Sequence, residues 1–137
     1  MSVSAFRRRV EQIAMVTFNE AAAMLDEILD ELPELFCKGL NGGVYLLPEV
    51  RMHHKSKIRQ PLYILGEYVS RHDLGNFINL YYGSIVRVYP HLPPNEMRKT
   101  LERVFIHEFT HHLEFLAGER GLEIKDEIEM ERYSSSS

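Results

Sequence analysis

The sequence predicts a single α+β domain, and three observations lead to this class. Apolar residues recur at helical spacing near the N-terminus and again between residues 94 and 117. Between these segments lie short β-branched and aromatic runs, separated by glycine, asparagine and proline. Helices, then strands, then helices is an order typical of α+β folds. The length of 137 residues suits one domain, 1–137, with one hydrophobic core.

Helices are expected first. Residues 4–14 have helical apolar spacing, and whether they form an extra helix of their own or join the next one stays open at this stage. Thr17 and Glu20 match a capping box, in which each side chain satisfies the other residue's backbone amide. An amphipathic helix follows and carries Leu25, Ile28, Leu29 and Leu32. Pro33 marks the region of its end.

Short strands are expected in the middle of the chain, in a small, mostly antiparallel or mixed sheet. The segments predicted as strands are 44–47, 62–65 and 77–82. Residues 85–89 fit either a fourth strand or a short helix. The polar and basic segment 51–60 is predicted as a loop, and residues 70–76 as a turn.

The most distinctive element is a helix predicted over residues 94–117. Pro94 and Glu96 are typical of a helix N-terminus, and Gly118 is typical of the residue after a helix C-terminus. Apolar side chains surround most of this helix, which predicts that it lies in the core. A final short helix is expected over 123–133, followed by a disordered tail at 134–137.

Within the long helix, His107-Glu108-Phe109-Thr110-His111 forms an H-E-x-x-H motif. Two histidines four positions apart lie on nearly the same helix face, so both imidazoles can reach one metal ion. Glu108 is offset by about a quarter turn, where its carboxylate can reach water at the metal. A zinc ion with an open coordination position lowers the pKa of water towards about 7, and a neighbouring carboxylate can then take the proton. The motif predicts that His107 and His111 bind zinc and that Glu108 is the general base.

A third protein ligand is expected, because catalytic zinc is usually held by three protein side chains. His112 points about 100° away from His111 and is predicted to pack or to hydrogen-bond outside the metal site. Asp126 is the favoured third ligand, since the chain is predicted to turn back after Gly118. The other acids that stay open as third ligands are Glu123, Glu127 and Glu114.

Composition excludes several other classes of function. The net charge of -4 gives no reason to expect nucleic acid or an anionic membrane as a partner. The neighbouring His53 and His54 lie in the basic segment and are expected to be solvated.

One cysteine, Cys37, cannot form an intrachain disulfide, and no secretory signal or membrane span is visible. A cytoplasmic location is therefore expected.

Over roughly residues 15–130 the sequence resembles the small bacterial zinc metallopeptidases with a minimal zincin fold. The segments that carry the resemblance are Leu29-Asp30-Glu31-Leu32-Pro33, Leu65-Gly66-Glu67-Tyr68, Ile78-Asn79-Leu80-Tyr81-Tyr82-Gly83 and the stretch from Val104 to His112. The resemblance implies a compact α+β domain in which the strand before the motif helix, 78–83, lies beside the metal cleft. It also implies that zinc is held in the pattern H-E-x-x-H-x-x-G-x-x-D.

The sequence departs from that pattern after the second histidine. Glu114 stands at the position of the glycine and Ala117 at the position of the aspartate. The segment Ile124-Lys125-Asp126-Glu127 looks like the displaced counterpart of the aspartate segment. The resemblance therefore supports Asp126 as third ligand only through an inferred insertion.

Three functional hypotheses follow from the motif. The first is a zinc-dependent peptidase that hydrolyses a peptide or protein substrate, with Glu108 as general base. The second is a zinc-binding regulatory or interaction module without peptidase turnover. The third is a structural domain whose histidines are satisfied by hydrogen bonds in the core. The substrate and the oligomeric state stay open.

Overall fold

The computed structural model describes residues 15–34 and 39–118. In chain order its elements are α2 (Phe18–Asp30), β1 (Gly43–Leu47), β2 (Arg51–Met52), β3 (Tyr63–Ile64), β4 (Gly66–Arg71), β5 (Gly75–Tyr81), α3 (Tyr82–Val88) and α4 (Pro94–Ala117). The predicted α+β class is confirmed. The predictions for residues 1–14, Cys37, 123–133 and 134–137 lie outside the described residues.

The strands form two small sheets of different kinds. The larger sheet has the order β1-β5-β4, in which β1 is parallel and β4 antiparallel to the central strand β5. The smaller sheet is the antiparallel pair of β2 and β3. A mixed sheet is therefore present, as predicted, and β4 lies at one of its edges.

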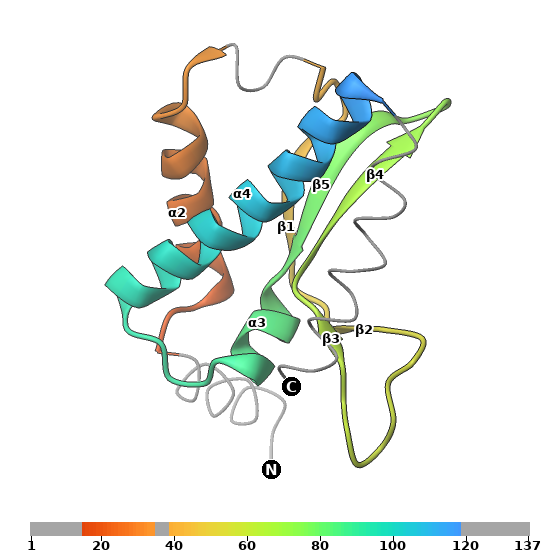
Figure 1. The fold of residues 1–137 in the computed structure, drawn as a ribbon. Helices are drawn as coiled ribbons and strands as arrows, with labels where there is room; N and C mark the ends of the chain where they lie inside the picture. Colours follow the sequence, from red (N-terminus) through yellow and green to blue (C-terminus); the bar gives the residue numbers. More distant parts are fainter. Residues whose placement is uncertain (1–14, 35–38, 119–137) are drawn as a thin grey trace.

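Helix α4 is the element that connects the layers of the fold. Figure 1 shows it running diagonally across the molecule, with α2 on one side and the strands β5 and β4 on the other. Its buried side chains Leu101, Val104 and Phe105 join Ile78 and Leu80 of β5 in one hydrophobic core. Burial of this apolar surface is the main stabilising contribution to the fold.

The two long helices begin and end close to where the sequence signals predicted. The Glu20 amide donates to Thr17 Oγ1 and the Thr17 amide donates to Glu20 Oε1, both at 3.1 Å, so the capping box is confirmed. Helix α2 ends at Asp30, a few residues before Pro33. Helix α4 has proline in its first turn and Gly118 as its C-cap. Both boundaries follow from local residues, and each was therefore visible in the sequence.

The strand predictions were wrong in three places. The segment predicted as a turn at 70–76 is narrower, because β4 extends to Arg71 and β5 begins at Gly75. Strand β4 itself was missed, since its sequence GEYVSR lacks clear apolar alternation and its pairing with β5 stabilises it. The segment 51–60 begins with the short strand β2. The ambiguous segment 85–89 belongs mostly to helix α3, which follows β5 directly.

The outer face of α4 also differs from the prediction of a helix surrounded by core. Ile106, Leu113 and Leu116 are 47%, 51% and 57% exposed. The helix is therefore buried on one side only. Within residues 15–34 and 39–118, no helix combines the length and the apolar character needed to cross a membrane.

Candidate metal centre

The second half of α4 brings the three motif residues together. His107, Glu108 and His111 each offer a ligand atom, and these atoms all lie within 4.8 Å of one another. The two imidazole ring centroids are 5.0 Å apart, and their planes are inclined by 83°. This is the arrangement expected for side chains one helical turn apart on the same face. The three side chains therefore lie together, and their binding of a metal ion stays a prediction.

The group is mostly buried, but it has one exposed member. Glu108 is 7% and His111 4% exposed, whereas the side chain of His107 is 34% exposed. His107 Nε2 lies 3.9 Å from Glu108 Oε2. The group therefore lies at the surface of the core, where His107 is in contact with solvent. Such a position permits exchange of small molecules and keeps the carboxylate largely out of bulk water.

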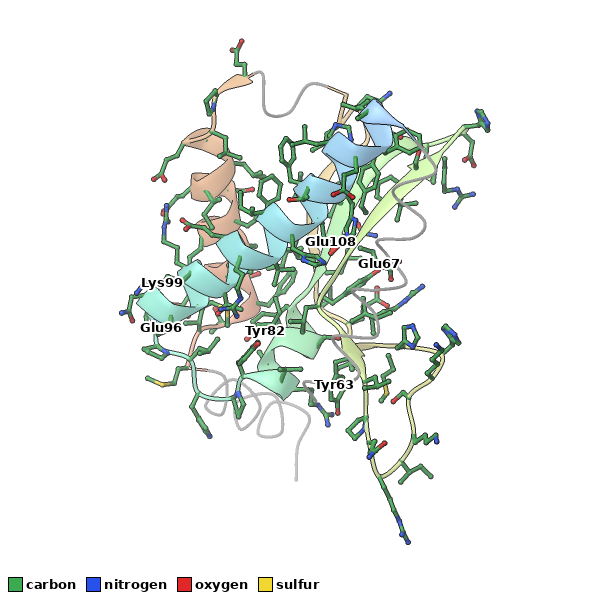
Figure 2. All side chains as sticks on the ribbon, viewed as in Figure 1. Tyr63, Glu67, Tyr82, Glu96, Lys99 and Glu108 are labelled. Carbon is green, nitrogen blue, oxygen red and sulfur yellow. The ribbon has the colours of Figure 1, made fainter. Side chains whose placement is uncertain are left out.

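Strand β4 approaches α4 closely at this group, because residue 66 is glycine. A Cβ atom on Gly66 would lie 2.8 Å from Val104 Cγ1 and 3.2 Å from Glu108 Cγ. Any side chain here would push the strand and the helix apart. Figure 2 shows Glu108 near the middle of α4, on the side towards β4. The glycine thus sets the distance between the edge strand and the carboxylate.

His112 is not a member of this group and contacts β4 at a second position. It is fully buried, and its Nδ1 lies 2.8 Å from the hydroxyl of Tyr68 in β4. Burial raises the pKa of Tyr68 to about 12, so the phenol stays protonated at neutral pH. Which of the two groups donates depends on the tautomer of the imidazole. The prediction that His112 hydrogen-bonds outside the metal site agrees with this contact.

A second polar network joins the small sheet to the large one. The Tyr81 hydroxyl donates to Glu67 Oε1 at 3.1 Å, and Arg51 Nε lies 3.3 Å from the same oxygen. Burial, and then the charge of Glu67, raises the pKa of Tyr81 to about 12. The Arg51 amide donates to Ser84 Oγ at 2.8 Å, which fixes the start of β2 against α3. The end of β4 nearest Glu108 is therefore tied to β2.

One solved structure allows a comparison with a known protein. A conserved hypothetical protein from Thermus thermophilus is 31% identical to this chain, with a TM-score of 0.63. The match covers 74% of this chain and 98% of that chain. The chain belongs to the family of that protein. The name of that protein gives no activity and no ligand. The likeness therefore supports the α+β fold, and the chemistry has to be inferred from the residues of the site.

No protein-family model matches the chain, and no curated protein matches it either. Function is therefore inferred from the residues of the site. The fold shared with the family supplies the frame on which α4 and β4 hold these residues.

The favoured third metal ligand and two of its alternatives lie outside the part of the chain that the structure describes. Asp126, Glu123 and Glu127 lie outside the described residues. Glu114 lies further along α4 and is not among the described residues whose ligand atoms meet at His107 and His111. The assignment of Asp126 as third ligand remains a prediction.

Sequence reasoning missed two residues that shape the site, Gly66 and Tyr68. Both lie in β4, and both were visible only as part of the Leu65-Gly66-Glu67-Tyr68 segment that resembles the metallopeptidases. The resemblance also implied that the strand at 78–83 lies beside the cleft. In the structure this segment is the end of the central strand β5 and the first residues of α3, and β4 is the strand whose backbone lies against Glu108.

Proposed function

We propose that the protein is a zinc-dependent peptidase in which His107 and His111 hold the metal and Glu108 is the general base. The observation that carries the proposal is the meeting of two imidazoles and a carboxylate within 4.8 Å on a largely buried helix face. Burying such groups is costly unless they are partnered, and a bound metal ion is one way to satisfy them.

The donor set fits zinc. Imidazole nitrogens suit zinc well, and Asp126 as the favoured third ligand would complete a set of two histidines and one carboxylate. Glu127, Glu123 and Glu114 remain the alternatives for that place. When bound, zinc supplies a Lewis acid that polarises a carbonyl group and acidifies water.

Glu108 has the position that a general base needs. Its carboxylate lies beside both imidazoles, and it is 7% exposed. From there it can accept a proton from water and deliver that proton to the amine that leaves when a peptide bond is cut. His107, which is partly exposed, lies where a substrate would enter.

The edge of the sheet offers a place for an extended peptide. Strand β4 pairs with β5 on one side and is an edge strand of the larger sheet. Edge strands present unpaired backbone amides and carbonyls, to which an extended peptide can add as a further strand. Because Gly66 lies against Glu108, a peptide added along β4 would pass close to the general base.

One observation favours the alternative, a zinc-binding interaction module without turnover. Ile106, Leu113 and Leu116 are exposed on the same helix that carries the metal ligands. Their spacing places them on one face, which is a feature of helices that contact another protein.

Cleavage measurements on the wild type and on Glu108→Gln separate these functions. Both proteins are loaded with zinc, their metal content is measured, and they are incubated with unfolded protein and with mixed peptides. We expect zinc in both and a rate about 10²–10⁴-fold lower in the variant. Equal cleavage by both proteins would contradict the role of Glu108. Bound zinc with no cleavage by either would favour the interaction module.

A further inference from the structure

The hairpin formed by β2, β3 and the loop between them is the most positively charged part of the described chain. We call residues 51–64 the basic hairpin. They include Arg51, Lys55, Lys57 and Arg59, and no acidic residue. Figure 1 shows the loop projecting from the lower end of the sheet. A concentration of positive charge in a chain of net charge -4 points to a ligand of opposite sign.

Some basic residues of the described chain are paired with carboxylates, and three cations of this loop are not. Arg71, Arg98 and Lys99 each lie within ion-pair distance of a carboxylate. Arg51 contacts Glu67 in the same way. No carboxylate of residues 15–34 or 39–118 lies within 4.0 Å of the charged groups of Lys55, Lys57 and Arg59.

The loop also forms a shallow hollow, largely open to solvent, that Lys55 and Lys57 line. Its other lining residues are His54, Ser56, Gln60 and Leu62. None of them carries a negative charge. Burial, followed by the charges of His54 and Lys55, lowers the pKa of the adjacent His53, which is consistent with a positive local potential.

Backbone hydrogen bonds give the hollow a defined shape. The His53 amide donates to the Leu62 carbonyl at 2.8 Å, and the Leu62 amide donates to Ser56 Oγ at 3.0 Å. Lys57 and Gln60 exchange backbone hydrogen bonds at 3.2 and 3.1 Å. The loop is therefore a hairpin held by hydrogen bonds of its own.

The hollow is close in sequence to Gly66, and Gly66 lies against Glu108 of the proposed catalytic group. Strand β3 ends at Ile64, and β4 begins at Gly66, the residue that lies against Glu108. Leu62 in the wall of the hollow is separated from Gly66 by a chain of at most roughly 14 Å. An extended peptide covers that distance with roughly four residues.

We propose that this hollow binds a carboxylate of the substrate, so that acidic peptides are the preferred substrate class. The inference rests on the proposed peptidase function. It adds a specificity site made of Lys55 and Lys57 to the catalytic group on α4. Ion pairs with exposed lysines are individually weak, so the site acts by selecting among peptides rather than by binding them tightly.

Fluorescence anisotropy with matched peptides tests this site. Two labelled peptides of identical length are compared, one with aspartates and one with asparagines at the same positions, on the Glu108→Gln protein so that no cleavage interferes. We expect the acidic peptide to bind about tenfold more tightly at low salt and to lose this advantage at high salt. The single variants Lys55→Glu and Lys57→Glu, each made in that protein, should reduce the preference about three- to tenfold.

Lys99→Glu is the matched control, because it makes the same change of charge on α4, well away from the hairpin (Figure 2). It should leave the preference for the acidic peptide unchanged. Equal binding of both peptides, or an equal effect of Lys99→Glu and Lys55→Glu, would overturn the inference. Binding of a single-stranded oligonucleotide without any preference for the acidic peptide would overturn it too.

The result is separable from that of the proposed function. A charge preference in binding together with no cleavage by the wild type supports the hollow and contradicts the peptidase. Cleavage by the wild type without any preference between the two peptides supports the peptidase and overturns the hollow.

Discussion

The two halves of α4 bury side chains of different kinds. In the first half the buried residues are mostly apolar, such as Met97, Leu101 and Phe105, and Arg98 contacts two carboxylates of the α2 region at the surface. In the second half Glu108, His111 and His112 are buried beside Phe109. One helix therefore contains a part that resembles an ordinary core and a part that buries polar side chains together with apolar ones.

The two halves of α4 therefore differ in what their buried side chains contribute to the fold. Apolar burial stabilises a fold, whereas buried ionisable groups lower its stability unless they are partnered. The polar half faces β4, whose Gly66 and Tyr68 contact Glu108 and His112. The buried polar residues of this half belong to the proposed metal site or contact β4, and apolar burial does not account for them.

The largest effect on stability is expected in the apolar half. Leu101→Ala removes a fully buried side chain and should lower the free energy of unfolding by about 2–5 kcal/mol, measured by urea denaturation. Ile106→Ala, at a half-exposed position of the same helix, is the control and should have a much smaller effect. Zinc content should not change in either variant that remains folded. A loss of zinc in folded Leu101→Ala would show that the two halves are not independent.

A smaller loss is expected where β4 meets the polar half. Gly66→Ala introduces a Cβ at 2.8 Å from Val104 and should lower the free energy of unfolding by about 1–3 kcal/mol. It should also lower the cleavage rate, because the strand moves away from Glu108. Gly118→Ala is the control, since no atom of the described residues lies within 4 Å of a Cβ there. Unchanged cleavage by Gly66→Ala would contradict the role given to the close approach of β4.

Tyr68→Phe tests the polar half of α4, because it should change both the stability of the fold and the dependence of that stability on pH. Loss of the hydroxyl leaves buried His112 without this hydrogen bond and should cost about 1–3 kcal/mol near neutral pH. The pKa of Tyr68 is raised to about 12 from its ordinary value of 10.0, so the folded state favours the neutral phenol. The stabilisation due to that shift is fully present below pH 10 and is lost as the pH rises towards 12.

Denaturation curves between pH 8 and 12 check this prediction. The wild type should lose stability over the alkaline part of the range, and Tyr68→Phe should lose less of it, while Tyr81 still contributes in both proteins. Tyr45→Phe, at an exposed position of β1, is the control. Identical alkaline profiles for the wild type and Tyr68→Phe would exclude the buried contact with His112 as their cause.

The smallest effect is expected at the surface of the apolar half. Arg98→Ala removes contacts at 2.7 Å with Glu27 and 3.0 Å with Glu31. Exposed ion pairs contribute little and are screened by salt, so the change in stability should be smaller than for Leu101→Ala, Gly66→Ala or Tyr68→Phe and should vanish in high salt. A loss as large as that of Gly66→Ala, persisting in high salt, would mean that the ion pairs hold α2 to α4.

Some parts of the molecule were predictable from the sequence because their signals are local. The Thr17 and Glu20 capping box, the limits of α4 and the meeting of His107 with His111 all depend on residues within a few positions of one another. Strand β4 was missed because its stability comes from pairing with β5 rather than from its own residues.

The contacts that complete the site depend on pairs far apart in the chain. Tyr68 and His112 are 44 positions apart, and nothing in either local sequence predicts the hydrogen bond between them. Gly66 and Glu108 are also far apart in the sequence. Only the folded chain brings this glycine of β4 against α4. The third metal ligand stays at the level of prediction, since Asp126 lies outside the described residues.

Binding of one metal ion by His107 and His111 is the central claim, and metal content measures it most directly. The wild type, His111→Ala and the control His72→Ala, altered at an exposed turn, are purified without added metal and examined by mass spectrometry for metals. We expect about one zinc ion per chain in the wild type and in His72→Ala, and a background level in His111→Ala. Background zinc in the wild type, or the same zinc content in all three proteins, would contradict the claim.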